Sequence, residues 1–173
     1  MTTDDVLIVD GYNMIGAWPE LREAAERDLE EARDRLIELL ADYQGFTGIK
    51  VILVFDAHQV PGLGARLKQR GLDIRYTKEK ETADECIERL VGELMRRRRR
   101  IQVATSDYAE QRVIFGRGAL RLSARELLNQ VRESRRLIEQ TIRHRQESRR
   151  NSFDHHLRGE WKEVFERWRR GRK

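Results

Sequence analysis

Two short stretches decide the fold: VLIVDG at residues 6–11 and KVILVFD at residues 50–56. Each is a continuous run of aliphatic residues that ends at an aspartate, which is typical of a strand buried on both faces of a sheet. Between these stretches, apolar residues recur at helical spacing from Leu29 to Tyr43. The pattern therefore predicts a strand–helix–strand unit with two parallel strands.

The same alternation continues along the chain. LDIRYT at residues 72–77 alternates apolar and polar residues, as in a half-exposed strand near a sheet edge, and IQVAT at residues 101–105 reads as a fourth strand. Between them, Thr82 and Glu85 predict a capping box that opens a helix. A short helix at residues 109–115 and one more short strand should follow. We expect an α/β, three-layer fold with a mainly parallel central sheet that binds ligands at the carboxyl ends of its strands.

The C-terminal part of the sequence is rich in arginine and reads as helix. Ser123 and Glu126 predict a second capping box, which opens a long helix that should reach Arg149. A break is expected at residues 151–152, followed by a final helix that docks on the main domain through a stripe of Trp161, Val164, Phe165 and Trp168. We therefore expect a core at residues 1–122 and a basic helical extension at residues 123–173, packed on the core as part of one domain.

Charge divides the chain of 173 residues into two parts. Residues 1–116 carry 18 basic against 22 acidic residues, net −4, whereas residues 117–173 carry 17 against 8, net +9. This asymmetry predicts an acidic site with an extension that binds a polyanion, although a solvated charged helix is the plainer alternative. The single cysteine, Cys86, argues against a disulfide framework and a cysteine-based zinc site. With neither a signal peptide nor a membrane span expected, the sequence predicts a soluble cytoplasmic protein.

Aspartates follow three of the four predicted strands, at Asp10, Asp56 and Asp107. Because parallel strands end at one edge of a sheet, these carboxylates should lie close together. Asp84 falls in the first turn of the helix capped by Thr82 and is expected to face inward beside them. Gathered carboxylates repel one another unless a cation neutralises them. Oxygen ligands favour Mg²⁺ or Mn²⁺, and carboxylate-held ions of this kind hydrolyse phosphodiesters.

Simpler roles exist for most of these acids. Asp84 could favour the helix N-terminus through its charge alone, Asp107 could cap a helix together with Glu110, and Asp56 could position a turn. Asp10 stands apart, because the segment after it shows no evident helix for it to cap. A metal site is therefore the hypothesis that the spacing favours, and the substrate stays open.

The acidic motifs also carry a family resemblance. Together they resemble the YacP-like branch of the NYN-domain ribonucleases, relatives of the PIN-domain nucleases, at residues 9–15 (VDGYNMI), 54–57 (VFDA), 77–84 (TKEKETAD) and 104–107 (ATSD). The similarity extends through residues 115–119 and 123–127 and reappears at residues 165–171. It implies a PIN-like α/β fold and metal-dependent endoribonuclease activity, which in the best-known bacterial member acts on messenger RNA in the ribosomal A site.

The resemblance implies roles for individual residues. Asp10 and Asp84 would be the principal metal-binding catalytic carboxylates, and Asp107 would complete the acidic centre. Asn13 would position the site or contact the scissile phosphate. Two further acids could hold a water in the outer shell of the metal: Glu81 and Asp56. No role carries over to residues 143–158, so His144, His155 and His156 receive none.

An acidic centre repels RNA, so neighbouring arginines must hold its backbone. The nearest candidates are Arg117, Arg121 and Arg125, which occur at four-residue intervals and would share one side of a helix if helix has begun there. Ordinary surface charge is the alternative. The run at residues 96–100 should lie at the amino ends of the strands, as a solvated helix end or a contact to ribosomal RNA. Tyr12 or Tyr108 could stack on a base, with aromatic packing as the alternative.

The acidic residues and the resemblance together thus predict a Mg²⁺- or Mn²⁺-dependent endoribonuclease with no membrane association. Messenger RNA and the ribosome as its partners are what the resemblance implies. A non-catalytic RNA- or ribosome-binding factor is the main alternative. A metal-dependent phosphatase for small molecules would share the acidic strand ends but leaves the arginine-rich extension unexplained.

Overall fold

The computed structural model describes residues 4–57, 66–97, 100–107 and 118–171. The chain divides into two compact units, Met1–Arg135 and Arg136–Lys173. The division falls within helix α6 (Ala124–Arg170), so the first turns of this helix belong to the first unit. The boundary expected at residue 122, and the packing of the extension within one domain, remain predictions.

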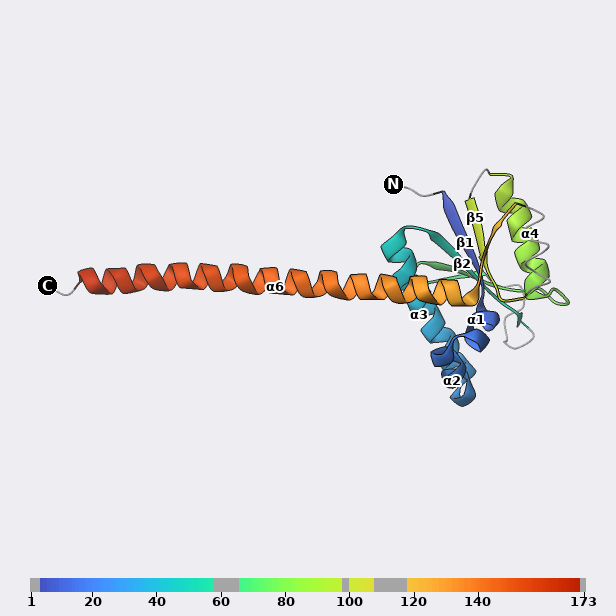
Figure 1. The fold of residues 1–173 in the computed structure, drawn as a ribbon, viewed down its shortest axis with the longest axis horizontal. Helices are drawn as coiled ribbons and strands as arrows, with labels where there is room; N and C mark the ends of the chain where they lie inside the picture. The colour runs from blue at the N-terminus through green and yellow to red at the C-terminus, as the bar shows by residue number, and fades with distance from the viewer. Residues whose placement is uncertain (1–3, 58–65, 98–99, 108–117, 172–173) are drawn as a thin grey trace. The chain divides into compact units, whose positions relative to one another are not determined.

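Among the described residues, six strands form a sheet at the centre of the first unit (Figure 1). Their order across the sheet is β3-β4-β2-β1-β5-β6. Neighbouring strands are parallel except for the antiparallel pair β3 and β4. The strands are β1 (Asp5–Asp10), β2 (Lys50–Phe55), β3 (Arg66–Gln69), β4 (Leu72–Tyr76), β5 (Arg100–Ala104) and β6 (Leu120–Leu122). The predicted α/β fold with a mainly parallel sheet is therefore confirmed.

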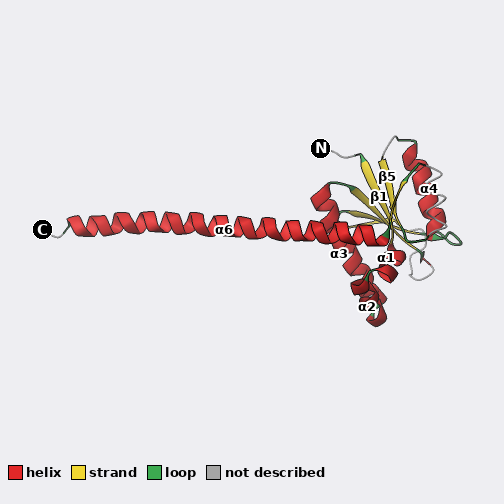
Figure 2. Ribbon diagram, in the orientation of Figure 1, coloured by secondary structure: helices red, strands yellow, loops and turns green. Residues whose placement is uncertain are grey.

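Helices cover both faces of this sheet (Figure 2). Successive residues of β1 alternate between two apolar clusters, as the pleat of a strand requires. Leu7 and Val9 pack in the cluster that holds the buried residues of α1 (Gly11–Ala17), α2 (Pro19–Arg27) and α3 (Leu29–Thr47). Val6 and Ile8 pack in the cluster of α4 (Ala83–Met95). Two apolar layers, one on each side of the sheet, hold the first unit together.

Both predicted capping boxes are present. The Glu85 N–H donates to Thr82 Oγ1 at 3.2 Å, and the Thr82 N–H donates to Glu85 Oε2 at 3.1 Å. At the start of α6 the Glu126 N–H donates to Ser123 Oγ at 3.1 Å, and the Ser123 N–H donates to Glu126 Oε2 at 2.8 Å. Each box satisfies two backbone donors at a helix start, so local sequence fixes where α4 and α6 begin.

Three elements have no counterpart in the sequence prediction. Helices α1 and α2 follow β1 without a loop, and β3 has the sequence RLKQ with every residue exposed, so it lacks the alternation that marks a strand. The helix expected at residues 109–115, together with Tyr108, Glu110 and Arg117, lies outside the described residues.

Helix α6 runs through residues 151–152, so the predicted break is wrong. Asn151 and Ser152 are only modest helix breakers, and no proline accompanies them. Beyond them, the side chains of Trp161 and Trp168 are 59% and 79% exposed. Docking of this stripe on the main domain remains a prediction. Within the described part of the chain, no helix combines the length and apolar character needed to cross a membrane.

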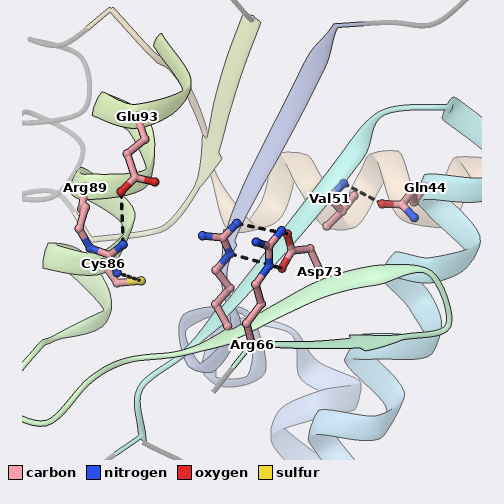
Figure 3. Close-up of polar contacts among 8 residues, drawn as sticks. Gln44, Val51, Arg66, Asp73, Cys86, Arg89 and Glu93 are labelled. Atoms are coloured by element: carbon pink, nitrogen blue, oxygen red, sulfur yellow. Dashed lines mark hydrogen bonds and ion pairs between the residues drawn. The ribbon is translucent and has the colours of Figure 1, made fainter. Parts of the chain in front are cut away.

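An ion cluster centred on the buried carboxylate of Asp73 joins the two antiparallel strands β3 and β4 (Figure 3). The Asp73 side chain is 2% exposed and accepts from Arg66 Nη2 at 2.8 Å and Arg75 Nη2 at 3.3 Å. Both arginines also donate through Nε, at 3.2 and 3.3 Å. Burial alone would raise the pKa of Asp73, but the two guanidiniums outweigh it and hold this pKa below its usual value. Because Arg66 and Arg75 lie directly opposite each other, Asp73 also separates two like charges.

We expect Asp73→Asn to lower the free energy of unfolding at neutral pH by about 1–3 kcal/mol, because two guanidiniums lose their shared counter-charge. Since the folded-state pKa of Asp73 is lowered, its contribution exists above the unfolded pKa and disappears as the pH falls through the folded value. Urea unfolding measures the effect. The exposed Asp42→Asn on α3 serves as the matched control, and an equal effect of both substitutions would contradict the assignment.

Candidate active site

Asp10 is both the last residue of β1 and the N-cap of α1. Its Oδ1 accepts the Asn13 N–H at 3.3 Å, so the expectation that no helix follows Asp10 is wrong. The helix can begin at once because residue 11 is a glycine: a Cβ there would lie 2.4 Å from Cε1 of Phe55. The cap explains the position of Asp10 but not its environment, because N-caps ordinarily lie in water.

The environment of Asp10 disfavours its charge. Burial raises its pKa, the Asn13 N–H lowers it, and the charges of Asp84, Asp107 and Asp56 raise it further, from an ordinary value of 3.8 to about 6. The structure therefore places three of the other predicted candidates, Asp84, Asp107 and Asp56, within electrostatic range of Asp10. Like charges gathered around a half-buried carboxylate are typical of a site that binds a cation or transfers a proton.

Two buried threonines hold the loops that carry Asp56 and Asp107. The Ala57 N–H donates to Thr77 Oγ1 at 2.9 Å, directly after Asp56. The Asp107 N–H donates to Thr105 Oγ1 at 3.1 Å, and the Thr105 N–H donates to the Leu122 carbonyl of β6 at 3.1 Å. Sequence reasoning assigned no role to either threonine, although each is the last residue of a predicted strand and marks the point where the chain leaves the sheet.

Asn13 connects α1 to the loop after β5. Its Oδ1 accepts the Ser106 N–H at 2.9 Å, across 93 positions of sequence. Since Asp107 is the next residue, this hydrogen bond fixes the start of the loop that carries the carboxylate. Of the two roles considered for Asn13, positioning of the site has a visible contact in the structure.

Asp84 and Glu81 lie at the start of α4 but in different surroundings. Asp84 is exposed, so the expectation that it faces inward is wrong, because the buried stripe of α4 begins only at Cys86. Glu81 accepts the Lys78 N–H at 3.0 Å and Arg89 Nε at 3.1 Å. Burial raises the pKa of Glu81, but these donors outweigh it and lower the pKa overall. Glu81 therefore forms an ion pair with Arg89 of α4, and this pair holds the loop before α4 in place.

The donor chemistry of the site fits a hard divalent cation. Within residues 4–57, 66–97, 100–107 and 118–171, no three acidic, histidine or cysteine side chains lie close enough to form a ready-made metal site. Mg²⁺ does not require one, because it is usually held by one or two carboxylates, with water and substrate phosphates as its other ligands. Asp10, Asp84 and Asp107 offer only oxygen ligands, which suit Mg²⁺ or Mn²⁺.

The predicted RNA-binding arginines do not share one side of a helix. Arg121 lies on β6 and Arg125 in the first turn of α6, both exposed, because the helix begins only after Ser123. Arg117 lies outside the described residues. In the basic run, Arg100 begins β5 opposite Asp5, which places it at the amino ends of the strands as expected. Residues 98–99 of that run are also outside the described range.

Tyr12 packs within an aromatic cluster at the same end of the sheet. Its ring lies 5.1 Å from that of Phe55, and its hydroxyl accepts Arg33 Nη1 at 3.1 Å. Aromatic packing, the alternative to base stacking, is therefore observed for Tyr12. Arg33 comes from α3 and had no sequence signal, because only the tertiary fold brings it to this edge.

Comparisons with known proteins agree on one family. The model of the YacP-like NYN domain matches residues 7–170. Over 167 residues the chain is 50% identical to the uncharacterized protein YacP of Bacillus subtilis (strain 168), covering 96% of this chain and 98% of that protein. The NYN domain is a nuclease-type domain with an RNA-related function.

Solved structures give the same result. A crystal structure of Rae1 (YacP) from Bacillus subtilis matches with a TM-score of 0.74 and 50% identity, over 96% of this chain and 95% of that one. A tryptophan-to-leucine variant of the same protein matches with a TM-score of 0.72 and 52% identity, over 80% and 82% of the two chains. The family resemblance of the acidic motifs is confirmed.

We expect Asp10→Asn to raise the free energy of unfolding at about pH 7, without divalent cations, by about 1–3 kcal/mol. Asparagine keeps the N-cap but removes the disfavoured charge. The folded-state pKa of Asp10 is raised, so the cost of its charge is absent below the unfolded pKa and complete above about 6. Urea unfolding at about pH 7 and about pH 4 should show the gain only at the higher pH. A loss of stability at about pH 7 would contradict this account.

We expect Asn13→Ala to speed hydrogen exchange of the Ser106 amide roughly tenfold, because its acceptor is removed. Amide exchange followed by NMR measures this directly. Asn13→Asp is the matched control, since it keeps an oxygen acceptor and should preserve protection. Equal exchange in wild type and Asn13→Ala would exclude the positioning role.

Proposed function

The chain belongs to the YacP-like NYN domain family, and we propose that it is a metal-dependent endoribonuclease that hydrolyses phosphodiester bonds in RNA. The observation that supports this most directly is the state of Asp10. Its carboxylate is half-buried, its pKa is raised to about 6, and three other aspartates act on it at one edge of the sheet. Such a cluster costs free energy when nothing neutralises it, and metal-dependent phosphodiester hydrolysis uses this arrangement.

The proposed mechanism assigns a task to each residue. Asp10, Asp84 and Asp107 would hold Mg²⁺ or Mn²⁺. When bound, the cation supplies activation of water and neutralisation of charge on the scissile phosphate. Asn13 keeps the loop of Asp107 in place through the Ser106 N–H. Asp56 contributes negative charge beside Asp10, and Glu81 is paired with Arg89. Either of these acids would hold a water in the outer shell of the cation.

We propose messenger RNA on the ribosome, at the A site, as the substrate, and the cytoplasm as the location. The family resemblance supports this proposal, as does the concentration of basic residues after residue 116, net +9. Arg117, Arg121 and Arg125 remain the proposed contacts to the RNA backbone, since they follow β5 along the chain. A substrate presented by the ribosome would leave the isolated protein with little activity on naked RNA.

Cleavage of a translated messenger RNA in a purified translation system with Mg²⁺ tests the proposal. We expect wild type to cleave, and Asp10→Asn and Asp84→Asn to lose at least about a hundredfold in rate, because each removes a charge that would hold the cation. Naked RNA in parallel shows whether the ribosome is required.

The exposed Asp42→Asn is the matched control, because it makes the same chemical change on α3. Asp42 is not among the four aspartates that interact at the carboxyl ends of the strands, Asp10, Asp56, Asp84 and Asp107, which we call the acidic edge. It should cleave as wild type does. If wild type, Asp10→Asn and Asp84→Asn all leave several messages intact but still bind ribosomes or RNA, the endoribonuclease proposal fails. A non-catalytic RNA- or ribosome-binding factor would then be the better description.

A further inference from the structure

The β-hairpin formed by β3 and β4 carries a concentration of positive charge that the catalytic proposal does not use. Residues 66–76 contain four basic residues, at 66, 68, 70 and 75, and one acidic residue, Asp73. Their net charge is therefore +3, within a part of the chain, residues 1–116, whose net charge is −4. Because Asp73 is buried, the charge that this hairpin presents to solvent is positive.

Three of these basic side chains lie on one face of the hairpin, which we call the basic hairpin face: Arg66, Lys68 and Arg75. Arg66 is opposite Arg75, and Lys68 is opposite Asp73. Directly opposite residues of antiparallel strands point to the same side, as do residues two apart in one strand. Positive groups therefore converge on one surface.

The basic hairpin face is on the α4 side of the sheet. Leu72 and Ile74 pack in the cluster of α1–α3, so the residues that alternate with them, Asp73 and Arg75, face the opposite side. There, α4 covers residues of β1, β2 and β5. The charges of Arg75 and Arg89 both act on the thiol of Cys86, which lies on α4 two residues after Asp84. Arg75 is therefore within electrostatic range of the first turn of α4.

The two arginines of this face are pre-organised. Each donates through Nε and Nη2 to the Asp73 carboxylate, in two bidentate pairs. A guanidinium has five N–H donors, so phosphate oxygens can bind to those that remain. Figure 3 shows Arg66 held in this way, and its side chain is 59% exposed. A guanidinium already fixed by a buried carboxylate loses less conformational freedom when it binds a phosphate.

One residue of the basic hairpin face, Arg75, lies beside a strand that ends at the acidic edge. Arg75 is paired with Val54 of β2, two residues before Asp56. Arg75 therefore lies beside the carboxyl end of β2, the strand that Asp56 follows. A polyanion held at the acidic edge needs positive charge beside it, because the aspartates repel its other phosphates.

We propose that the basic hairpin face binds the RNA backbone, through phosphates of nucleotides that flank the scissile bond. The proposal rests on the function proposed above and adds a binding surface to it. A purely structural role is the competing explanation, since charged residues on an edge strand such as β3 also prevent aggregation. That role predicts no effect of these side chains on RNA affinity.

Binding is best measured in full-length protein carrying Asp10→Asn, so that cleavage does not interfere. The probe is a fluorescein-labelled, unstructured single-stranded oligoribonucleotide, and anisotropy gives Kd at several salt concentrations. Arg66→Gln and Lys68→Gln should each weaken binding several-fold and reduce the slope of log Kd against log salt by about 0.7, the value for one phosphate contact on a single strand. Arg22→Gln is the matched control, because Arg22 is an exposed arginine on α2, which packs on the other side of the sheet.

Lys68→Gln keeps the proposal falsifiable if loss of Arg66 disturbs the hairpin, because Lys68 is outside the ion cluster of Asp73. Weaker binding and a reduced slope for both variants, with Arg22→Gln unchanged, would support the proposal. Unchanged Kd and slope for Lys68→Gln would overturn it, whatever Arg66→Gln does, since an effect of Arg66→Gln alone is then attributable to the hairpin structure.

The same experiment separates this inference from the proposed function. Binding in the Asp10→Asn background does not depend on catalysis, so a protein that cleaves nothing can still bind RNA through the hairpin. In the active protein, Lys68→Gln should raise KM for RNA several-fold with kcat unchanged. A fall in kcat alone would contradict a role in binding.

Discussion

The parallel pairing of β1 between β2 and β5 is the constraint on which the rest of the structure depends. Asp10 pairs with Val54 of β2, and Val9 pairs with Ala104 of β5, so the chain leaves all three strands at the same edge. This register brings the charges of Asp56 and Asp107 to act on Asp10, and α4 adds Asp84. A one-residue slip would exchange the two apolar clusters of the sheet, so hydrophobic packing holds the acids together against their repulsion.

Local hydrogen bonds hold the loops beside these acids in place. The Thr77 and Thr105 hydroxyls accept the N–H groups of Ala57 and Asp107. The side-chain oxygen of Asn13 accepts the Ser106 N–H. Asp73 and Glu81 are in a different environment from Asp10, since each is paired with arginine and has a lowered pKa. Asp10 has a raised pKa instead, and this contrast is the reason for proposing that Asp10, rather than Asp73 or Glu81, belongs to a ligand site.

Much of the fold was predictable because its signals are local. Strands β1, β2 and β5 are aliphatic runs, and capping boxes at Thr82 and Ser123 mark the starts of α4 and α6. The elements that escaped prediction lack such signals. Helix α1 begins at Gly11 with no linker after β1, and β3 is an exposed edge strand with no apolar alternation. Helix α6 continues through Asn151 because weak local preferences do not break a long helix.

The sequence by itself determined the α/β fold, the family and the identity of the acidic candidates, because these depend on periodicity and on motifs within a few residues. Only the tertiary structure decided which groups act on one another. The bond from Ser106 to Asn13, the contact of Arg33 with Tyr12 and the clamp of Asp73 by Arg66 and Arg75 depend on strand register or on segments distant in sequence. Burial and the summed field of neighbouring charges set the state of Asp10, and both exist only once the chain is folded.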